Sequence, residues 1–183
     1  MRLAPAAIRH HHDRARAIDV ARRQSATTHA ALAAVDACAF FAGLLVDAIN
    51  GADCSTLLSP QAFDGQREIA AIAAGSYMGK TRAEVASSGY VVDTLEAALW
   101  CLLKTESYEE CVLKAVNLGN DTDTVAAVAG GLAGILYGSG SIPSRWLKQI
   151  PKLDYIKSLC EKLEDALEKM STQKLIAFIP TTD

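Results

Sequence analysis

The chain has 183 residues, half of them hydrophobic, which is enough for one domain with a substantial core. A formal net charge of -3 provides no basic field for a nucleic-acid backbone, so we expect no nucleic-acid partner. Five scattered cysteines lack metal-ligand spacing and fit a reducing compartment better than a disulfide framework. No apolar run approaches the roughly 20 residues of a membrane span, and the apolar part of the N-terminus is too short for a signal peptide. These features predict a cytoplasmic protein without a membrane partner.

The first third of the chain predicts three helices. A short one covers residues 5–12, and Asp13 is a plausible cap for a second one that runs to about residue 24. Apolar residues at helical spacing then predict a long amphipathic helix over residues 30–50, ended by a glycine. Asp36 lies away from the centre of its apolar stripe, so we expect that carboxylate to be solvated or bonded locally.

A connector over residues 51–64 and a short helix over residues 65–74 follow. Capping boxes pair a polar N-cap residue with a glutamate three residues later. The chain has this spacing at Thr81 and Glu84, at Asp93 and Glu96, and at Ser107 and Glu110. The last two pairs predict a helix over residues 93–104 and a second helix that Ser107 caps and Gly119 ends, and the short connection makes these helices antiparallel neighbours.

The stretch from residue 118 to residue 138 combines oxygen donors with a core helix. Asp121, Asp123 and Thr124 stand within four residues at its start, and apolar residues recur with a helical period after them. Glycines four residues apart on an adjoining face indicate that another backbone approaches closely. We therefore expect this helix to be central and buried.

Two interpretations of the three oxygen donors remain open. Asp121 could cap the helix, and Asp123 would then be favoured by the positive end of the helix dipole. A cap needs only one of these residues, however, and in a tight loop two carboxylates and the Thr124 hydroxyl can converge on one point. Such an all-oxygen set suits Mg²⁺, Mn²⁺ or Ca²⁺ better than zinc or copper.

The sequence Leu-Gly-Asn-Asp-Thr-Asp-Thr at residues 118–124 resembles the C-terminal signature of the ADP-ribosylglycohydrolase family. Residues 87–100, the pair Thr28-His29 and the opening Met-Arg-Leu-Ala-Pro also resemble family blocks, in family order. The resemblance implies an all-α, compact multi-helix domain around a two-metal Mg²⁺ or Mn²⁺ centre that hydrolyses ADP-ribose linkages. We expect this domain to cover residues 1–170.

The C-terminal part of the chain predicts one more helix and a tail. The helix begins near Pro151, and its apolar stripe is typical of a packing helix. The tail, residues 171–183, contains an apolar patch over residues 175–179, which could form a short strand or a docking segment.

The resemblance also assigns two groups of site residues, but no catalytic acid or base. The metal ligands would be Asp121, Asp123 and Thr124. The cleft that binds ADP-ribose would be lined by His29, Ser88, Gly89 and Tyr90. The residues alone leave simpler roles open, because a lone histidine is more often a cap or a surface residue and Tyr90 could merely pack against a helix.

The family's other metal ligands come from a Thr-Asp-Asp-type motif upstream of the Met-Arg-x-Ala-Pro block. Since this block opens the chain and no second acidic pair of that kind follows, we expect the N-terminal part of the family domain to be absent. The chain would then carry the C-terminal half of the metal centre and bind metal weakly, unless a partner chain supplies the rest. Its other expected partners are ADP-ribose or an ADP-ribosylated protein. The alternative is a catalytically inactive family member that binds ADP-ribose or has a structural role.

Overall fold

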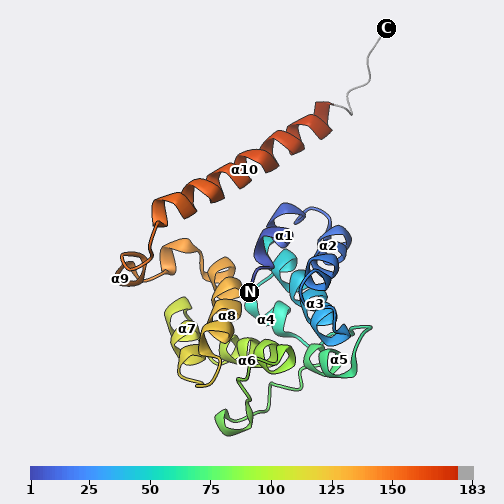
Figure 1. Ribbon diagram of the computed structural model, residues 1–183, viewed down its shortest axis with the longest axis vertical. Helices are drawn as coiled ribbons and strands as arrows, with labels where there is room; N and C mark the ends of the chain where they lie inside the picture. The colour runs from blue at the N-terminus through green and yellow to red at the C-terminus, as the bar shows by residue number, and fades with distance from the viewer. Residues whose placement is uncertain (177–183) are drawn as a thin grey trace. The chain divides into compact units, whose positions relative to one another are not determined.

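Helices make up all the regular structure in residues 1–176, the part that the structure describes (Figure 1). In this computed structural model, side chains are described for residues 1–166. There are ten α-helices and two short 3-10 helices in this part. The predicted all-α fold class is thus confirmed. The chain divides into two units, Met1–Ile142 and Pro143–Asp183.

The first unit begins with three helices, and the first of them ends at Arg9, earlier than the predicted end at residue 12. They are α1 (Ala4–Arg9), α2 (Arg14–Ala26) and α3 (Leu32–Ile49). The predicted cap of α2 is confirmed, because Asp13 Oδ1 accepts a hydrogen bond from the backbone N–H of Arg16 at 2.9 Å. Gly51, in the left-handed region at φ 97°, lies just beyond α3 and lets the chain turn away.

Helix α3 is long and apolar enough to cross a membrane by length and composition, with 18 residues at a mean hydropathy of 2.0. The expectation that no apolar run approaches this length was therefore wrong. Burial gives α3 another explanation, since 61% of this window lies inside the protein, as in a core helix. Asp36 also differs from expectation, because its carboxylate is 10% exposed and pairs with Arg22 of α2 and the backbone N–H of Gln66.

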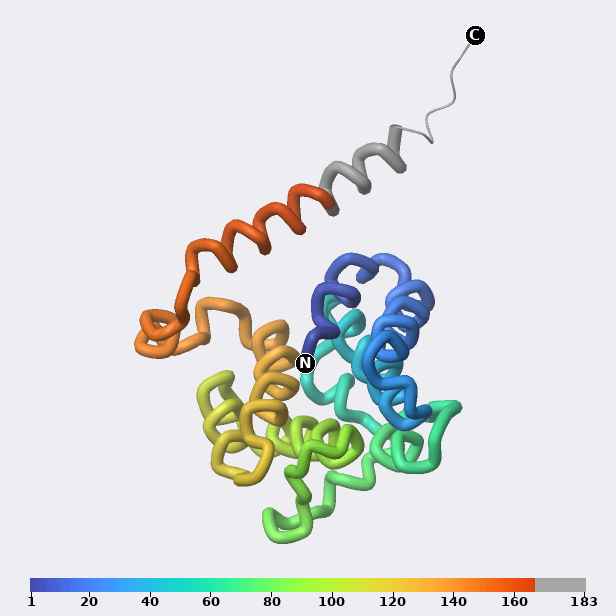
Figure 2. The backbone as a smooth tube through the Cα atoms, viewed as in Figure 1, coloured from blue at the N-terminus to red at the C-terminus, as the bar shows by residue number. Residues whose placement is uncertain are grey.

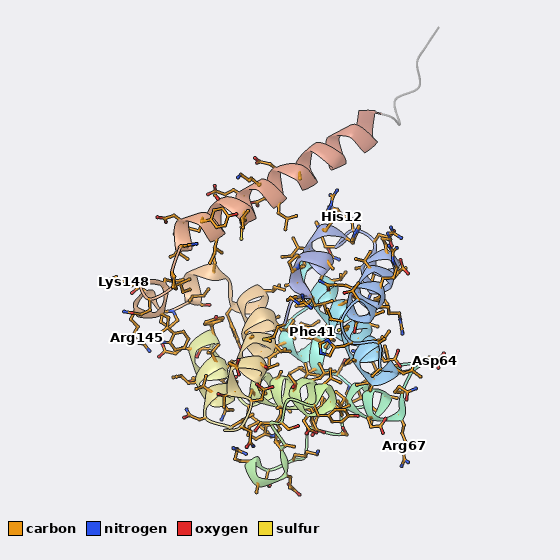
Figure 3. All side chains as sticks on the ribbon, viewed as in Figure 1. His12, Phe41, Asp64, Arg67, Arg145 and Lys148 are labelled. Carbon is orange, nitrogen blue, oxygen red and sulfur yellow. The ribbon has the colours of Figure 1, made fainter. Side chains whose placement is uncertain are left out.

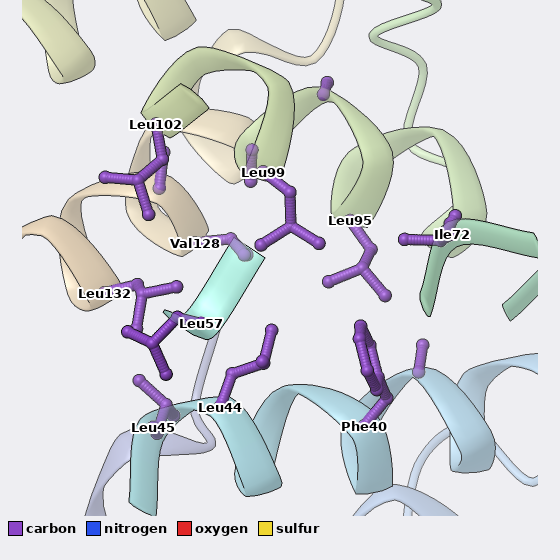
Figure 4. Close-up of a cluster of buried hydrophobic side chains, with 14 of the residues drawn as sticks. Phe40, Leu44, Leu45, Leu57, Ile72, Leu95, Leu99, Leu102, Val128 and Leu132 are labelled. Carbon is purple, nitrogen blue, oxygen red and sulfur yellow. The ribbon is translucent and has the colours of Figure 1, made fainter. Parts of the chain in front are cut away.

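The core of the first unit lies where α3 faces α6 (Val91–Leu103) and α8 (Thr122–Tyr137). Figure 4 shows the side chains that meet there from these helices and two shorter ones, among them Phe40, Leu44, Leu95, Leu99, Val128 and Leu132. Leu44 and Leu132 are each only 1% exposed. The prediction that the helix after residue 121 is buried is confirmed, because Leu132 of α8 packs into this common core.

Shorter elements connect the core helices. They are α4 (Cys54–Leu58), α5 (Arg67–Ala73), η1 (Arg82–Glu84), α7 (Tyr108–Val116) and η2 (Ser139–Ser141). Helix α4 lies within the stretch expected to be a connector, and its N-cap Asp53 accepts from the backbone N–H of Thr56 at 2.8 Å. A five-residue helix offers too little periodicity for the sequence to reveal it.

The capping boxes have mixed outcomes. Thr81 and Glu84 form one at η1, and Ser107 accepts from the N–H of Glu110 at 3.2 Å as the cap of α7. The box expected at Asp93 and Glu96 is wrong, because α6 begins earlier, at Val91. Glu96 is 8% exposed and binds Lys80 Nζ at 2.6 Å instead of a helix end.

Helices α7 and α8 lie side by side, as the backbone trace in Figure 2 shows. The glycine face of α8 is in contact with side chains of α7: a Cβ on Gly130 would stand 3.3 Å from Val112, and one on Gly134 would stand 3.7 Å from Tyr108. The close neighbour of these glycines is therefore a pair of side chains, not the backbone that the sequence predicted. Only the contact between Gly130 and Val112 is tighter than an ordinary van der Waals contact.

The second unit contains α9 (Ser144–Leu147) and α10 (Leu153–Ile176). The expected helix is present, and it continues past residue 170, where we placed the start of the tail. Ile156 and Leu159 of its apolar stripe are 44% and 46% exposed. The apolar patch at 175–179 begins inside α10, and its remainder lies outside the described residues. The division of the chain into residues 1–170 and 171–183 stays a prediction.

Candidate functional site

The oxygen-rich loop between α7 and α8 owes its shape to two left-handed residues. Gly119 has φ 83° and Asn120 has φ 58°, whereas the helix α7 ends at Val116. Glycine adopts this conformation freely, and asparagine tolerates it better than most residues. The two residues reverse the chain, so that Asp121 stands at the first turn of α8.

Asp121 does not cap α8 in the usual way. It occupies the N-cap position, but its side chain accepts no bond from a backbone N–H of the helix. Its Oδ1 accepts instead from the hydroxyl of Thr124 at 2.9 Å. The capping interpretation therefore does not describe Asp121, whose carboxylate is oriented by a second oxygen donor of the same motif.

The second carboxylate oxygen of Asp121 faces the loop at residues 87–90. A Cβ on Gly89 would stand 3.0 Å from Asp121 Oδ2, which is closer than an ordinary van der Waals contact. Gly89 has no left-handed backbone that would itself demand glycine. Glycine at this position thus leaves the space that the Asp121 carboxylate occupies.

The loop before α6 is held by the side chain of Ser88. Its hydroxyl donates to Asp93 Oδ2 at 2.6 Å and accepts from the backbone N–H of Tyr90 at 3.1 Å. Thr94 Oγ1 donates to the Ser88 carbonyl at 3.2 Å. These bonds explain why Asp93 is not a cap, since its carboxylate is bound to Ser88. The Tyr90 side chain is 53% exposed.

A second group of polar residues ties the start of the chain to the loop before α3. The guanidinium of Arg2 donates to Thr28 Oγ1 at 3.2 Å, and His29 Nδ1 lies 3.0 Å from the same oxygen. Because Thr28 Oγ1 accepts from Arg2, its own proton is available to His29 Nδ1. Ser25 Oγ also donates to the His29 carbonyl at 3.0 Å.

A cavity of about 390 Å³ joins these two groups within the first unit. Four of the predicted site residues line it, namely His29, Gly89, Asp121 and Thr124. Its size is within the range of small-molecule sites, about 300–1,000 Å³. Ser88, Tyr90 and Asp123 do not line it, and the Asp123 side chain is exposed at the start of α8.

Sequence reasoning missed several of the other residues that line the cavity. They include Arg2, Cys38, Phe41 and Thr94. Figure 3 labels Phe41 on α3. Cys38 precedes it by three residues in the same helix. Cys38 belongs to the predicted apolar stripe of α3, and helical spacing alone cannot distinguish a residue that faces the core from one that faces a cavity within it.

The donors at the start of α8 fit part of a site for a hard divalent cation. Two carboxylates and a hydroxyl, from Asp121, Asp123 and Thr124, are all oxygen ligands of the kind that Mg²⁺ and Mn²⁺ prefer. Nowhere in the part of the chain that the structure describes do three or more His, Cys, Asp or Glu side chains form a group that could hold a metal ion. The described residues therefore supply an incomplete ligand set.

These features define an all-helical domain with a ligand-sized cavity that is edged by oxygen donors. The chain belongs to the ADP-ribosylglycohydrolase family, whose model matches residues 1–173. It is 41% identical over 165 residues to the ADP-ribosylarginine hydrolase Tri1 of Pseudomonas putida (strain GB-1), covering 90% of this chain and 44% of that protein. It is also 41% identical over 140 residues to the ADP-ribosylarginine hydrolase Tri1 of Serratia proteamaculans (strain 568), covering 76% of this chain and 38% of that protein.

A solved structure has a similar fold. It is an ADP-ribosylglycohydrolase-related protein complex, which matches with a TM-score of 0.79 and 37% sequence identity over 93% of this chain and 59% of that one. The chain thus spans less than half the length of the two curated relatives and somewhat more than half of this structure.

Proposed function

We propose that this chain is part of a metal-dependent hydrolase that removes ADP-ribose from a modified side chain or small molecule. The observation that carries the proposal is the cavity that adjoins His29, Gly89, Asp121 and Thr124, residues from three separate parts of the sequence. Membership of the ADP-ribosylglycohydrolase family supports the same chemistry. Because the two relatives that are 41% identical are ADP-ribosylarginine hydrolases, we propose ADP-ribosylated arginine as the first substrate to test.

The cavity offers complementary groups to such a ligand on different walls. Arg2 provides a guanidinium, oriented by its bond to Thr28, that suits a phosphate oxygen. Phe41 provides apolar surface for a ring of the ligand. His29 Nε2 is left to donate or accept a hydrogen bond, according to the tautomer, because Nδ1 is engaged by Thr28. In this proposal these residues bind and orient ADP-ribose, and Gly89 keeps the wall beside Asp121 free of side-chain atoms.

Asp121, Asp123 and Thr124 would hold Mg²⁺ or Mn²⁺ at the edge of this cavity. A bound ion would polarise ribose oxygens and lower the pKa of a water that attacks the anomeric carbon. Thr124 keeps the Asp121 carboxylate in one orientation by its bond to Oδ1, which leaves Oδ2 available. Further ligands are needed for tight binding, and we propose that they come from the remainder of the family domain or from a partner chain. The five free cysteines agree with a cytoplasmic location for this assembly.

A second candidate function is ADP-ribose binding without hydrolysis. The observation that favours it is the shortage of acidic groups, because Asp121 is the one carboxylate that lines the cavity in the part of the chain that the structure describes. Hydrolysis by general acid–base chemistry usually needs a positioned group beside the attacking water. A chain with a single carboxylate in the cavity would then act as a ligand-binding member of the family.

The test measures binding and hydrolysis on the same preparations. Calorimetric titration of the chain with ADP-ribose in Mn²⁺ is compared with the same titration of the Asp121→Asn variant, and release of ADP-ribose from ADP-ribosylated arginine is followed by chromatography. We expect binding that the variant weakens, together with metal-dependent release that is slow because the described residues supply an incomplete ligand set. Binding without release would support the second candidate. Absence of both would refute the two proposals.

A further inference from the structure

The carbonyl groups of the loop after α7 have no partners within a helix. A helix ends with carbonyls that lack intrahelical donors, and two left-handed residues, Gly119 and Asn120, carry the chain away at once. The carbonyls of Leu118 and Gly119 lie beyond the end of α7 and accept hydrogen bonds from side chains of residues 82–87. Leu118 is 4% exposed, so water has poor access to this side of the loop.

Ser87 supplies one of these donors and binds the loop twice. Its hydroxyl donates to the Gly119 carbonyl at 2.9 Å, and its own carbonyl accepts from the backbone N–H of Asp121 at 3.0 Å. The two bonds lie on either side of the left-handed Asn120, so they fix both peptide groups that join residues 119, 120 and 121. Ser87 is 2% exposed, which makes a replacement of its hydroxyl by water unfavourable.

Arg82 supplies the other donor. Its Nη2 donates to the Leu118 carbonyl, so a cation stands at the negative end of α7. Arg82 lies in η1, whose capping box fixes its backbone: Glu84 Oε2 accepts from both the N–H and the hydroxyl of Thr81 at 2.7 Å. These bonds also lower the pKa of Glu84. The donor is thus presented from a short but well-braced turn.

We propose that Ser87 is a positioning residue for the metal ligand Asp121, and that Arg82 assists it. The inference rests on the proposed function, because that proposal makes Asp121 a metal ligand. Whether Ser87 restrains the loop can be tested without metal. Ser87 holds the N–H of Asp121, while Thr124 holds its Oδ1. With the backbone and one oxygen fixed, the carboxylate keeps a single orientation beside Gly89. Loss of the Ser87 hydroxyl removes the bond to the Gly119 carbonyl, which water then replaces because Gly119 is exposed, and the loop can adopt other conformations.

The experiment compares Ser87→Ala with a matched variant, Ser107→Ala, in the full chain. The Ser107→Ala variant also loses one hydrogen bond of a serine hydroxyl, but Ser107 caps the opposite end of α7, away from the loop. Amide hydrogen exchange is measured for peptides that cover residues 118–125, and Mn²⁺ affinity is measured by the electron paramagnetic resonance of the free ion. Arg82→Gln, at an exposed position, is a second variant, which removes the guanidinium and its charge without opening the core.

We expect Ser87→Ala to raise exchange at residues 118–125 and to weaken Mn²⁺ binding, each by about two- to tenfold, from the loss of the hydrogen bond that the Ser87 hydroxyl donates to the Gly119 carbonyl. Arg82→Gln should act in the same direction, and Ser107→Ala should leave both quantities unchanged even where it lowers the melting temperature. Unchanged exchange at residues 118–125 in Ser87→Ala would overturn the inference. If Mn²⁺ binds the wild type no better than Asp121→Asn, the proposed function fails, while the exchange data still decide the role of Ser87.

Discussion

Gly89→Ala tests whether the Asp121 carboxylate and the loop at residues 87–90 form one site. The added Cβ would stand 3.0 Å from Asp121 Oδ2 and 3.8 Å from Cγ, so the carboxylate must move by a few tenths of an ångström. Rotation of the carboxylate stretches the 2.9 Å bond from Thr124 to Oδ1. A hydrogen bond to a charged group contributes about 1.5–3 kcal/mol, so its loss predicts Mn²⁺ binding that is about tenfold to a hundredfold weaker.

The fold should not suffer from this change. Gly89 is not in the left-handed region, and alanine at a compatible position stabilises by about 0.4–1 kcal/mol through the unfolded chain. Gly131→Ala is the matched control, because a Cβ there meets nothing within 4 Å on α8. Calorimetric titration with Mn²⁺ and thermal unfolding are measured for both variants and for Asp121→Asn. Mn²⁺ affinity within about twofold of wild type in Gly89→Ala, with a clear loss in Asp121→Asn, would refute the reasoning.

Other predictions concern the core and the thiols. Leu44→Ala should lower the free energy of unfolding, measured in urea, by about 2–5 kcal/mol, because Leu44 is 1% exposed. Leu113→Ala, at a 41% exposed position, should lower the free energy of unfolding far less. Equal decreases in the two variants would contradict the packing. Burial raises the pKa of Cys101 to about 12 and of Cys111 to about 11, so both should resist iodoacetamide at about pH 8 in the folded chain, while the exposed Cys160 reacts. Above the ordinary thiol pKa of 9.0, the unfolded chain releases thiol protons that the folded chain keeps. The melting temperature should therefore fall as the pH rises from 9.0 towards about 11. A melting temperature that rises over this range would contradict the burial of these thiols.

Local rules predicted the helices where the deciding contacts are local. Asp13 caps α2 through a bond to a residue three positions later, and Gly51 follows α3 in the conformation that glycine allows. The same rules failed at Glu96, because its partner is Lys80, 16 residues earlier, and not the helix end. They failed at Asp36 as well, since the backbone N–H that it binds lies 30 residues away. Such contacts depend on how helices pack, which sequence spacing does not encode.

Part of the candidate site could likewise be predicted from local sequence, and part depends on how the helices pack. The oxygen-rich motif and the Thr-His pair are visible in the sequence, and the structure brings Asp121, Thr124 and His29 to one cavity. Asp123 is exposed outside the lining of this cavity, and its role as a metal ligand stays a prediction. Arg2 was missed as a site residue because the Met-Arg-Leu-Ala-Pro block that contains it assigned no role to the arginine. Its relation to the site arises only from the packing of the residues around Thr28.

The most direct test of the central claim is thermal unfolding of the chain in EDTA and in Mn²⁺, each with and without ADP-ribose, beside the Asp121→Asn variant. A ligand at 100 times its dissociation constant stabilises by about 2.7 kcal/mol, which predicts a rise in melting temperature of about 5–10 °C. We expect a rise with Mn²⁺ that ADP-ribose enlarges and that Asp121→Asn abolishes. A melting temperature that stays the same under all four conditions would contradict a metal and ADP-ribose site in this chain.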